Sequence, residues 1–269
     1  MDRFNITKKL FEAFNNSPHP SLKVSNYFPI YAELFGHLID TDCTFIETGI
    51  LNGGSLFMWR SWLGAKARII GVDLNPSAKK WEQYGFEIYI GDQGDPNFWN
   101  ELMPKIGKFD ALLDDGGHQS FQQIVSLSSN LQYMKPKAVI AIEDTVTSHM
   151  RDFDHHRNRS FLEYAKDATD ILAARNATLW PSAYPKLLNL EILKSFNKIY
   201  NIQFFTGIVA FKANEFLNIA PEHVRNFVPD KNEHDFRYDG HTNSAIVEWP
   251  DPFMKTIVHI PGQQWISLQ

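Results

Sequence analysis

The segment 44–55, which reads TFIETGILNGGS, decides the fold of this chain. Its first five residues form a short run of strand length, and glycines at 49 and 53 follow directly. Glycines at the end of a strand let the backbone turn sharply and let a ligand approach closely. A helical pattern then begins at Gly54. Strand, glycine turn and helix in this order predict the first unit of a parallel sheet covered by helices.

The same alternation continues downstream. Further strands are predicted at 68–73, 86–91, 110–113 and 139–142, and helices at 54–63, 76–84, 96–103, 120–134 and 159–174. Two β-rich runs, 201–205 and 207–211, leave no room for a crossover helix between them, so we expect an antiparallel hairpin at the sheet edge. The sequence therefore predicts an α/β fold with a mostly parallel sheet.

Two flanking regions complete the chain. Residues 1–41 are predicted to form a helical cap with two helical pieces, the second at 27–38. The sheet domain is expected to span 42–213. Residues 214–269 contain several prolines and scattered aromatic residues with weak periodicity, which predicts an extension lying on the domain. A lid over the substrate or a contact in a homo-oligomer are the alternatives for this extension.

The composition of the chain indicates which classes of binding partner to expect. The chain has 269 residues, a formal net charge of −5 and no dense block of lysine and arginine, so nucleic acid and anionic membranes are not expected partners. Cys43 is the one cysteine, which excludes an intrachain disulfide. No run approaches the roughly 18 apolar residues of a membrane span. We expect a cytoplasmic protein that acts on a small molecule.

Acidic residues end the first three predicted strands. Glu47 stands two positions before Gly49 and suits a ligand with a cationic amino group. Asp73 lies 20 residues after Gly53, where a carboxylate can accept both ribose hydroxyls of a nucleoside. Asp92 and Gln93, which follow the third strand, suit the edge of an adenine ring. The alternative is a tight turn followed by helix caps, and the glycine spacing does not fit a G-x-G-x-x-G dinucleotide site.

The fourth and fifth strands end in a second acidic group. The fourth runs into Asp114-Asp115-Gly116-Gly117-His118, and the fifth into Glu143-Asp144. Carboxylates gathered at one rim repel one another, and a hard divalent cation such as Mg²⁺ relieves this repulsion. Asp115, Glu143 and Asp144 are therefore the predicted ligands.

His118 is the predicted general base, because its ordinary pKa lies near neutral pH and a metal-bound hydroxyl is more acidic. The alternative is that His118 caps the following helix. His149, His155 and His156 follow in a polar loop, without the spacing of a second metal site.

These motifs together resemble the class I S-adenosylmethionine (SAM) dependent methyltransferases, and most closely the group that holds the macrolide-sugar O-methyltransferases and the cephalosporin hydroxylase-like proteins. The resemblance spans about residues 24–213. It departs from the group at His149, where many relatives carry an aromatic residue, and at Gly117, which is often serine. It implies a seven-stranded, Rossmann-like sheet whose last strand is antiparallel, SAM as methyl donor, and magnesium at the strand ends.

The resemblance also implies roles for individual residues. It places the amino-acid part of SAM at Glu47 and Gly49, the ribose at Asp73 and the adenine beside Asp92 and Gln93. It places magnesium at Asp115, Glu143 and Asp144, and the base at His118. The predicted cofactor site further includes Asn52, Gly53, Ser55 and Asp114.

The function predicted from the sequence is methyl transfer from SAM to a hydroxyl group of a sugar, a polyol or a similar natural product, assisted by a divalent metal. A metal-dependent hydroxylase on the same scaffold is one alternative, although an iron site with two histidines and one carboxylate would be needed. A SAM-binding module that acts through protein contacts without catalysis is the other. A nicotinamide dehydrogenase is disfavoured by the glycine spacing.

Overall fold

The computed structural model describes residues 2–153, 159–174, 196, 198–214, 257–258 and 266–267. The chain divides into two compact units, Met1–Glu222 and His223–Gln269. What is described of the second unit is a pair of antiparallel strands, β8 (Ile257–Val258) and β9 (Ile266–Ser267). Apart from Asn214 and these two strands, the predicted extension lies outside the described residues, as do His155 and His156.

A seven-stranded sheet forms the centre of the first unit, in the order β3-β2-β1-β4-β5-β7-β6. The first five strands of the chain are parallel, whereas β7 runs antiparallel to both β5 and β6. The strands are β1 (Thr44–Thr48), β2 (Arg68–Asp73), β3 (Glu87–Ile90), β4 (Phe109–Asp114), β5 (Met134–Ile142), β6 (Ile199–Phe204) and β7 (Val209–Ala213).

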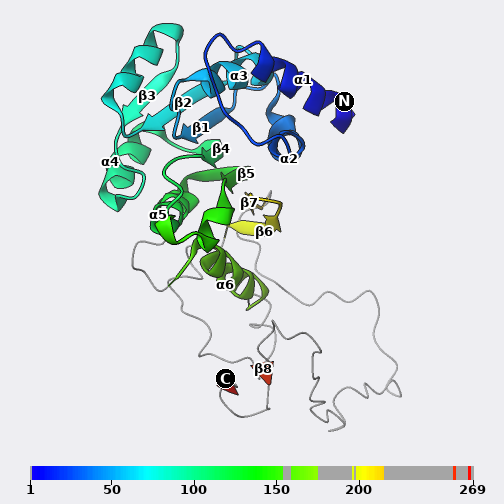
Figure 1. Cartoon of the computed structure of the whole chain (residues 1–269), viewed down its shortest axis with the longest axis vertical. Helices are drawn as coiled ribbons and strands as arrows, with labels where there is room; N and C mark the ends of the chain where they lie inside the picture. Colours follow the sequence, from blue (N-terminus) through cyan, green and yellow to red (C-terminus); the bar gives the residue numbers. More distant parts are fainter. Residues whose placement is uncertain are drawn as a thin grey trace, which may run out of the picture. The chain divides into compact units, whose positions relative to one another are not determined.

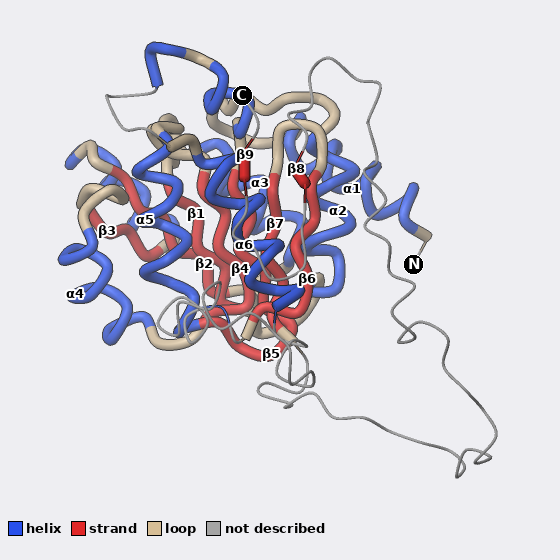
Figure 2. The backbone as a smooth tube through the Cα atoms, turned by 90° about the horizontal axis from the view of Figure 1, so that it is seen from below, coloured by secondary structure: helices blue, strands red, loops and turns tan. Residues whose placement is uncertain are grey.

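Helices cover both faces of this sheet (Figures 1 and 2). The α-helices are α1 (Arg3–Asn15), α2 (Tyr27–Phe35), α3 (Gly54–Leu63), α4 (Pro96–Ile106), α5 (Ser120–Asn130) and α6 (Phe161–Ala174). Short 3-10 helices are η1 (Gly36–Leu38), η2 (Pro76–Tyr84), η3 (Leu131–Tyr133), η4 (Thr145–His149) and η5 (Arg151–Phe153). Among the described residues, no helix combines the length and apolarity needed to cross a membrane.

Two hydrophobic clusters hold the helices to the sheet, because successive strand residues point to opposite faces. Phe45 of β1 packs in one cluster with residues of α1, α2 and α3. The next residue, Ile46, packs in the other cluster with residues of α4, α5 and α6. A sheet buried on both faces can present its polar groups only at its edges and at the ends of its strands.

The predicted seven-stranded Rossmann-like fold is confirmed, and β1, β2 and α3 have the predicted bounds. The helix predicted for 120–134 was wrong at its end. It stops at Asn130, and Met134 begins β5, where it pairs with Phe109 of β4. This pairing is a long-range contact that helical periodicity does not contain, and it places Met134 in the sheet. The predicted hairpin is present, with β6 at the edge and β7 between β5 and β6.

Candidate active site

The carboxyl ends of the central strands lie level with one another. Thr48 of β1 pairs with Asp114 of β4, which pairs with Ile142 of β5. The ladder continues one residue further: Asp115 N donates to Thr48 O at 3.0 Å, and Glu143 N donates to Asp114 O at 2.9 Å. The residues that follow each strand therefore emerge at one rim, where they line a cavity of about 560 Å³.

At one end of this cavity the chain turns through two glycines. Gly49 and Gly53 have φ angles of 80° and 75°, which favour glycine. A side chain at Gly49 would place its Cβ 2.2 Å from Asp115 O, and one at Gly53 would place it 2.3 Å from the Trp81 ring. Both positions thus require glycine for space as well as for conformation. Asn52 and Ser55 line the cavity beside them.

Asp73 fixes this turn from the end of β2. One of its carboxylate oxygens, Oδ2, accepts hydrogen bonds from Ile50 N at 3.0 Å and Leu51 N at 3.1 Å. The other, Oδ1, accepts from Asn75 N at 2.8 Å. Each carboxylate oxygen has two acceptor positions, so Oδ1 keeps one for a ligand hydroxyl. Asp73 lines the cavity, as a contact with ribose requires.

The residues after β3 divide into an outer and an inner group. Asp92 lies exposed at the cavity, with Oδ1 accepting from Gly94 N at 2.7 Å. The buried Gln93 amide donates to Asp114 Oδ1 at 2.8 Å and accepts from Gly117 N at 3.1 Å. Asp114 is itself buried, and this burial raises the pKa of its carboxyl group. Gln93 and Asp114 thus tie the β3 and β4 loops together.

At the other end of the cavity, a lysine that the sequence prediction did not include lies among the acids. The Lys23 side chain is 1% exposed, and its Nζ lies 2.5 Å from Asp115 Oδ2 and 3.4 Å from both Glu47 Oε1 and Glu143 Oε1. Burial by itself would lower the pKa of Lys23, but the three carboxylates outweigh it and raise the pKa above its ordinary value. Lys23 therefore remains an ammonium ion.

Two tyrosines of α2 bind the same group of acids. Tyr31 Oη donates to Glu143 Oε1 at 2.5 Å, and Tyr27 Oη donates to Asp144 Oδ1 at 2.6 Å. The two residues are four positions apart and so share one face of the helix. Burial, together with the neighbouring carboxylates, raises the pKa of both phenols. A buried tyrosine needs a partner for its hydroxyl, and this pair in an apolar helix was the signal available in the sequence.

Glu47 and Glu143 are both buried, and Glu143 also lines the cavity. Besides Lys23, Glu47 accepts a hydrogen bond from Ser55 Oγ at 2.7 Å. Burial raises the pKa of both carboxyl groups, and the positive charge of Lys23 opposes this rise. The predicted contact of Glu47 with the amino group of a ligand stays a prediction, and the carboxylate is engaged here by groups of the protein.

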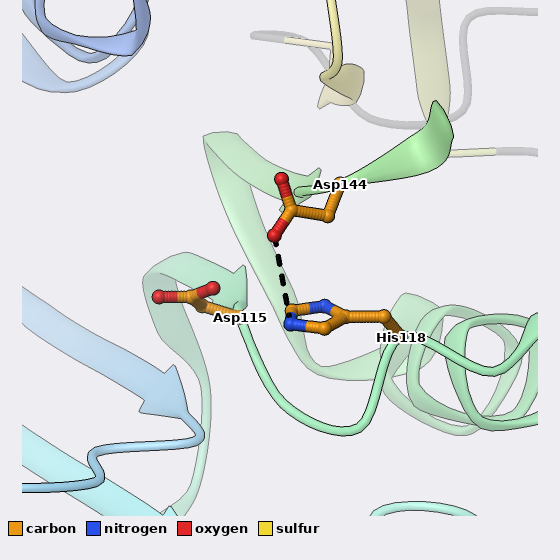
Figure 3. A group of neighbouring side chains, drawn as sticks. All are labelled: Asp115, His118 and Asp144. Carbon is orange, nitrogen blue, oxygen red and sulfur yellow. Dashed lines mark ion pairs between the residues drawn. The ribbon is translucent and has the colours of Figure 1, made fainter. Parts of the chain in front are cut away.

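The side chains of Asp115, His118 and Asp144 lie close together on the exposed side of this group of acids (Figure 3). One ligand atom from each lies within 4.8 Å of the others, and all three side chains are partly exposed. His118 Nε2 is 3.5 Å from Asp144 Oδ2. Asp115 and Asp144, two of the predicted metal ligands, are thus together, whereas Glu143 lies deeper. His118 lies where it could act either as a base or as a ligand, and both roles stay predictions.

Backbone strain is concentrated at this rim. His118 and Asp144 have φ angles of 56° and 52°, a region that costs residues other than glycine about 1–3 kcal/mol each. The buried Thr147 hydroxyl lies 2.8 Å from both His118 O and Asp144 O, so it can hold the two strained residues together. Strained residues of this kind cluster at functional sites, where the surrounding structure keeps them in place.

Comparison with known proteins gives relatives of one kind. No protein-family model matches the chain. Among curated proteins, it is 27% identical over 137 residues to the 8-demethyl-8-alpha-L-rhamnosyl tetracenomycin-C 2'-O-methyltransferase of Streptomyces olivaceus, covering 48% of this chain and 36% of the relative. It is 28% identical over 134 residues to the demethylmacrocin O-methyltransferase of Streptomyces fradiae, covering 47% of this chain and 33% of the relative. The matches thus span only about a third of each relative's length.

The similar solved structures include MycE methyltransferase from the mycinamycin biosynthetic pathway. The complex of MycE with Mg and SAH has a TM-score of 0.64 and 19% identity, covering 88% of this chain and 58% of MycE. The complex that also holds mycinamycin VI has a TM-score of 0.62 and 18% identity, covering 82% of this chain and 57% of MycE. The resemblance inferred from the motifs is confirmed: the chain has the Rossmann-like fold of the class I SAM-dependent methyltransferases, and its sequence is similar to those of the macrolide-sugar O-methyltransferases.

Proposed function

We propose that this protein transfers a methyl group from SAM to a hydroxyl group of a sugar-bearing small molecule, with the help of a divalent metal. The observation that carries the proposal is one cavity with two different ends. Gly49, Asn52 and Asp73 line the first end, and Asp115, His118 and Asp144 line the second. The curated relatives reported above are all named as O-methyltransferases, which supports the same chemistry.

The first end suits the cofactor. Gly49 lines the cavity without a side chain, so a ligand can approach the backbone there, and Asp73 Oδ1 keeps an acceptor position for a ribose hydroxyl. Asp92 reaches the cavity beside Asp73 and can accept a hydrogen bond from the amino group of adenine. Asn52 and Ser55 complete this end.

The second end suits a divalent cation. Asp115 and Asp144 offer carboxylate oxygens, which Mg²⁺ prefers, and His118 lies within the same group. With Glu47 and Glu143 there are four carboxyl groups beside one ammonium ion, so negative charge remains to be neutralised. A metal bound there would orient the acceptor hydroxyl and make it more acidic.

The protein's own residues then carry the proton. His118 Nε2, beside Asp144, accepts the proton of the acceptor hydroxyl. The hydroxyl oxygen forms a bond to the methyl carbon of SAM while the bond from that carbon to sulfur breaks, and the sulfur keeps the electron pair. Methyl ether, SAH and protonated His118 result. The strained backbone at His118 and Asp144, held by Thr147, keeps the imidazole next to the carboxylate.

Replacing His118 with alanine separates its two candidate roles. If His118 is the base, His118→Ala lowers turnover by about 10²- to 10⁴-fold and leaves the affinities for SAH and Mn²⁺ nearly unchanged in calorimetry. The matched control is His149→Ala, because His149 is exposed and ends η4, the short helix that follows Asp144. A parallel loss of Mn²⁺ affinity would make His118 a metal ligand, and undiminished turnover would remove it from the mechanism.

The acceptor is tested with glycosides that carry an L-rhamnosyl group with a free 2'-hydroxyl, the position named for the Streptomyces olivaceus relative. With SAM and Mg²⁺, mass spectrometry should show one added methyl group on the sugar for each SAM consumed. SAM binding without any methylated product across such a panel would contradict the proposal and favour a binding module.

A further inference from the structure

The link between α1 and α2 does more than connect two helices of the cap. Residues 20–24 line the cavity. Ser17 Oγ donates to Gly54 O at 2.8 Å, and a Cβ at Gly54 would lie 2.3 Å from His19 O, so the link packs tightly against the start of α3. This packing places the Lys23 side chain within the acid group.

The acids of that group differ in how far their side chains are exposed to solvent. Glu47 and Glu143 are fully buried, and both contact Lys23 Nζ. Asp115 and Asp144 have side chains that are 19% and 29% exposed. The Lys23 ammonium lies between these layers, since it contacts the two inner acids and the outer Asp115. We call Glu47 and Glu143 the inner acids, and Asp115 and Asp144 the outer acids.

We propose that Lys23 is a built-in cation that takes the inner acids as its counter-ions and confines a divalent metal to the outer acids. The part that concerns the metal rests on the proposed function. The sequence prediction that Glu143 is a metal ligand is revised. Glu143 instead pairs with Lys23 and accepts a hydrogen bond from Tyr31. Lys23 is thus a positioning residue for the metal.

Charge repulsion is the physical reason. An ion held by Asp115 and Glu143 together would lie within a few ångströms of an ammonium ion that touches both carboxylates. Two positive charges at that separation repel strongly in a buried site, where water screens little. An ion held by Asp115 and Asp144 shares only Asp115 with Lys23. Tyr31, which donates to the same Glu143 oxygen as Lys23, further holds that side chain on the inner side.

The test replaces the ammonium with an uncharged side chain of similar length. Lys23→Met should bind Mn²⁺ at least about 10-fold more tightly than the wild-type protein in calorimetry, or take up a second ion in electron paramagnetic resonance, because the inner acids become free. Lys80→Met is the matched control. Lys80 also lines the cavity, but it is exposed and lies over the Trp81 ring, so this change should leave Mn²⁺ affinity unaltered. Equal or weaker Mn²⁺ binding by Lys23→Met overturns the inference.

A second variant covers the case in which Lys23→Met does not fold. Lys23→Met with Glu143→Gln removes one cation and one anion, so it should have a higher Tm than Lys23→Met alone, or should fold where the single variant does not. Mn²⁺ should raise the Tm of any folded Lys23→Met protein more than that of the wild type. A double variant no more stable than Lys23→Met would mean that Lys23 does not compensate Glu143, and would overturn the inference.

The outcomes separate this inference from the proposed function. If the wild type binds no Mn²⁺ and Lys23→Met does, Lys23 stands in for the metal, and the metal-assisted function fails. If the wild type methylates its acceptor with Mg²⁺ while Lys23→Met binds Mn²⁺ no more tightly, the function stands and the role of Lys23 is wrong. If neither protein binds Mn²⁺, the inner acids do not take a cation even when freed, and the inference is wrong.

Discussion

The two ends of the cavity are built in different ways. At the cofactor end, Asp73 is held by backbone N–H groups at most 23 residues away in sequence, and the turn that it fixes follows directly from β1. At the acid end, Lys23 and the tyrosines of α2 reach carboxylates more than 100 residues away, such as Glu143 and Asp144. The first end is a local strand–turn–helix motif, whereas the second is assembled by the tertiary fold.

This difference predicts that the two ends bind their ligands independently. A change at the turn should alter the affinity for SAM or SAH and leave metal binding intact. A change among the acids should do the reverse. It also predicts that the acid end depends more on the packing of α2 and of the link before it, because Lys23 and Tyr31 from that region bind the buried carboxylate of Glu143.

The largest effects should come from exchanging one carboxylate at each end for its amide. Asp115→Asn removes a charged oxygen shared by the metal group and Lys23, so we expect Mn²⁺ affinity to fall by about 100-fold or more. Asp73→Asn turns one acceptor oxygen into a donor that faces backbone N–H groups, so SAH affinity should fall by about 10-fold, or about 1.4 kcal/mol.

Calorimetry measures the affinities of both variants for SAH and for Mn²⁺. Asp115→Asn should bind SAH, and Asp73→Asn should bind Mn²⁺, with an affinity within a few-fold of the wild-type value. If Asp115→Asn also lost SAH, or Asp73→Asn also lost Mn²⁺, the two ends would be one coupled site and the comparison would break down.

An effect smaller than that of Asp115→Asn is expected at Thr147, which also belongs to the acid end. Thr147→Val removes the hydroxyl that holds the carbonyl groups of His118 and Asp144, so the imidazole should be less well oriented. We expect turnover to fall by about 10-fold with SAH affinity unchanged. Thr147→Ser keeps the hydroxyl and should retain turnover close to that of the wild type. A loss in Thr147→Ser without one in Thr147→Val would point to packing of the γ-methyl group instead.

Two effects on stability should distinguish a buried acceptor from a partly exposed one within the acid end. Tyr31→Phe removes a donor from Glu143, whose side chain is 1% exposed, and should lower the free energy of unfolding by about 2 kcal/mol. Tyr27→Phe removes a donor from Asp144, where water can replace it, and should cost about 1 kcal/mol. Urea unfolding of both variants measures the difference, and a larger loss in Tyr27→Phe would contradict this ordering.

What the sequence could predict follows the same division. The alternating pattern of β1, β2 and α3 is local, so the strand ends and the acids that follow them could be placed at one rim from the sequence alone. The end of α5 could not be placed by periodicity, because the pairing of Met134 with Phe109 is a long-range contact.

Lys23 shows the main limit of the sequence prediction. The sequence predicts that the acids repel one another and that a metal neutralises them, whereas in the structure Lys23 neutralises part of the same charge. Nothing in the residues around Lys23 indicates that it is buried, since its partners Asp115 and Glu143 are 92 and 120 residues away. The tyrosine pair of α2 carried a usable signal, but not the identity of its acceptors.

The central claim is that one rim holds SAM at the glycine turn and a divalent metal at the outer acids. The most direct test is a crystal structure of the protein soaked with SAH and Mn²⁺, in which anomalous scattering locates the metal. We predict an anomalous peak coordinated by Asp115 and Asp144, and SAH lying along Gly49 and Asp73. A peak away from these acids, or SAH bound elsewhere, would contradict the account.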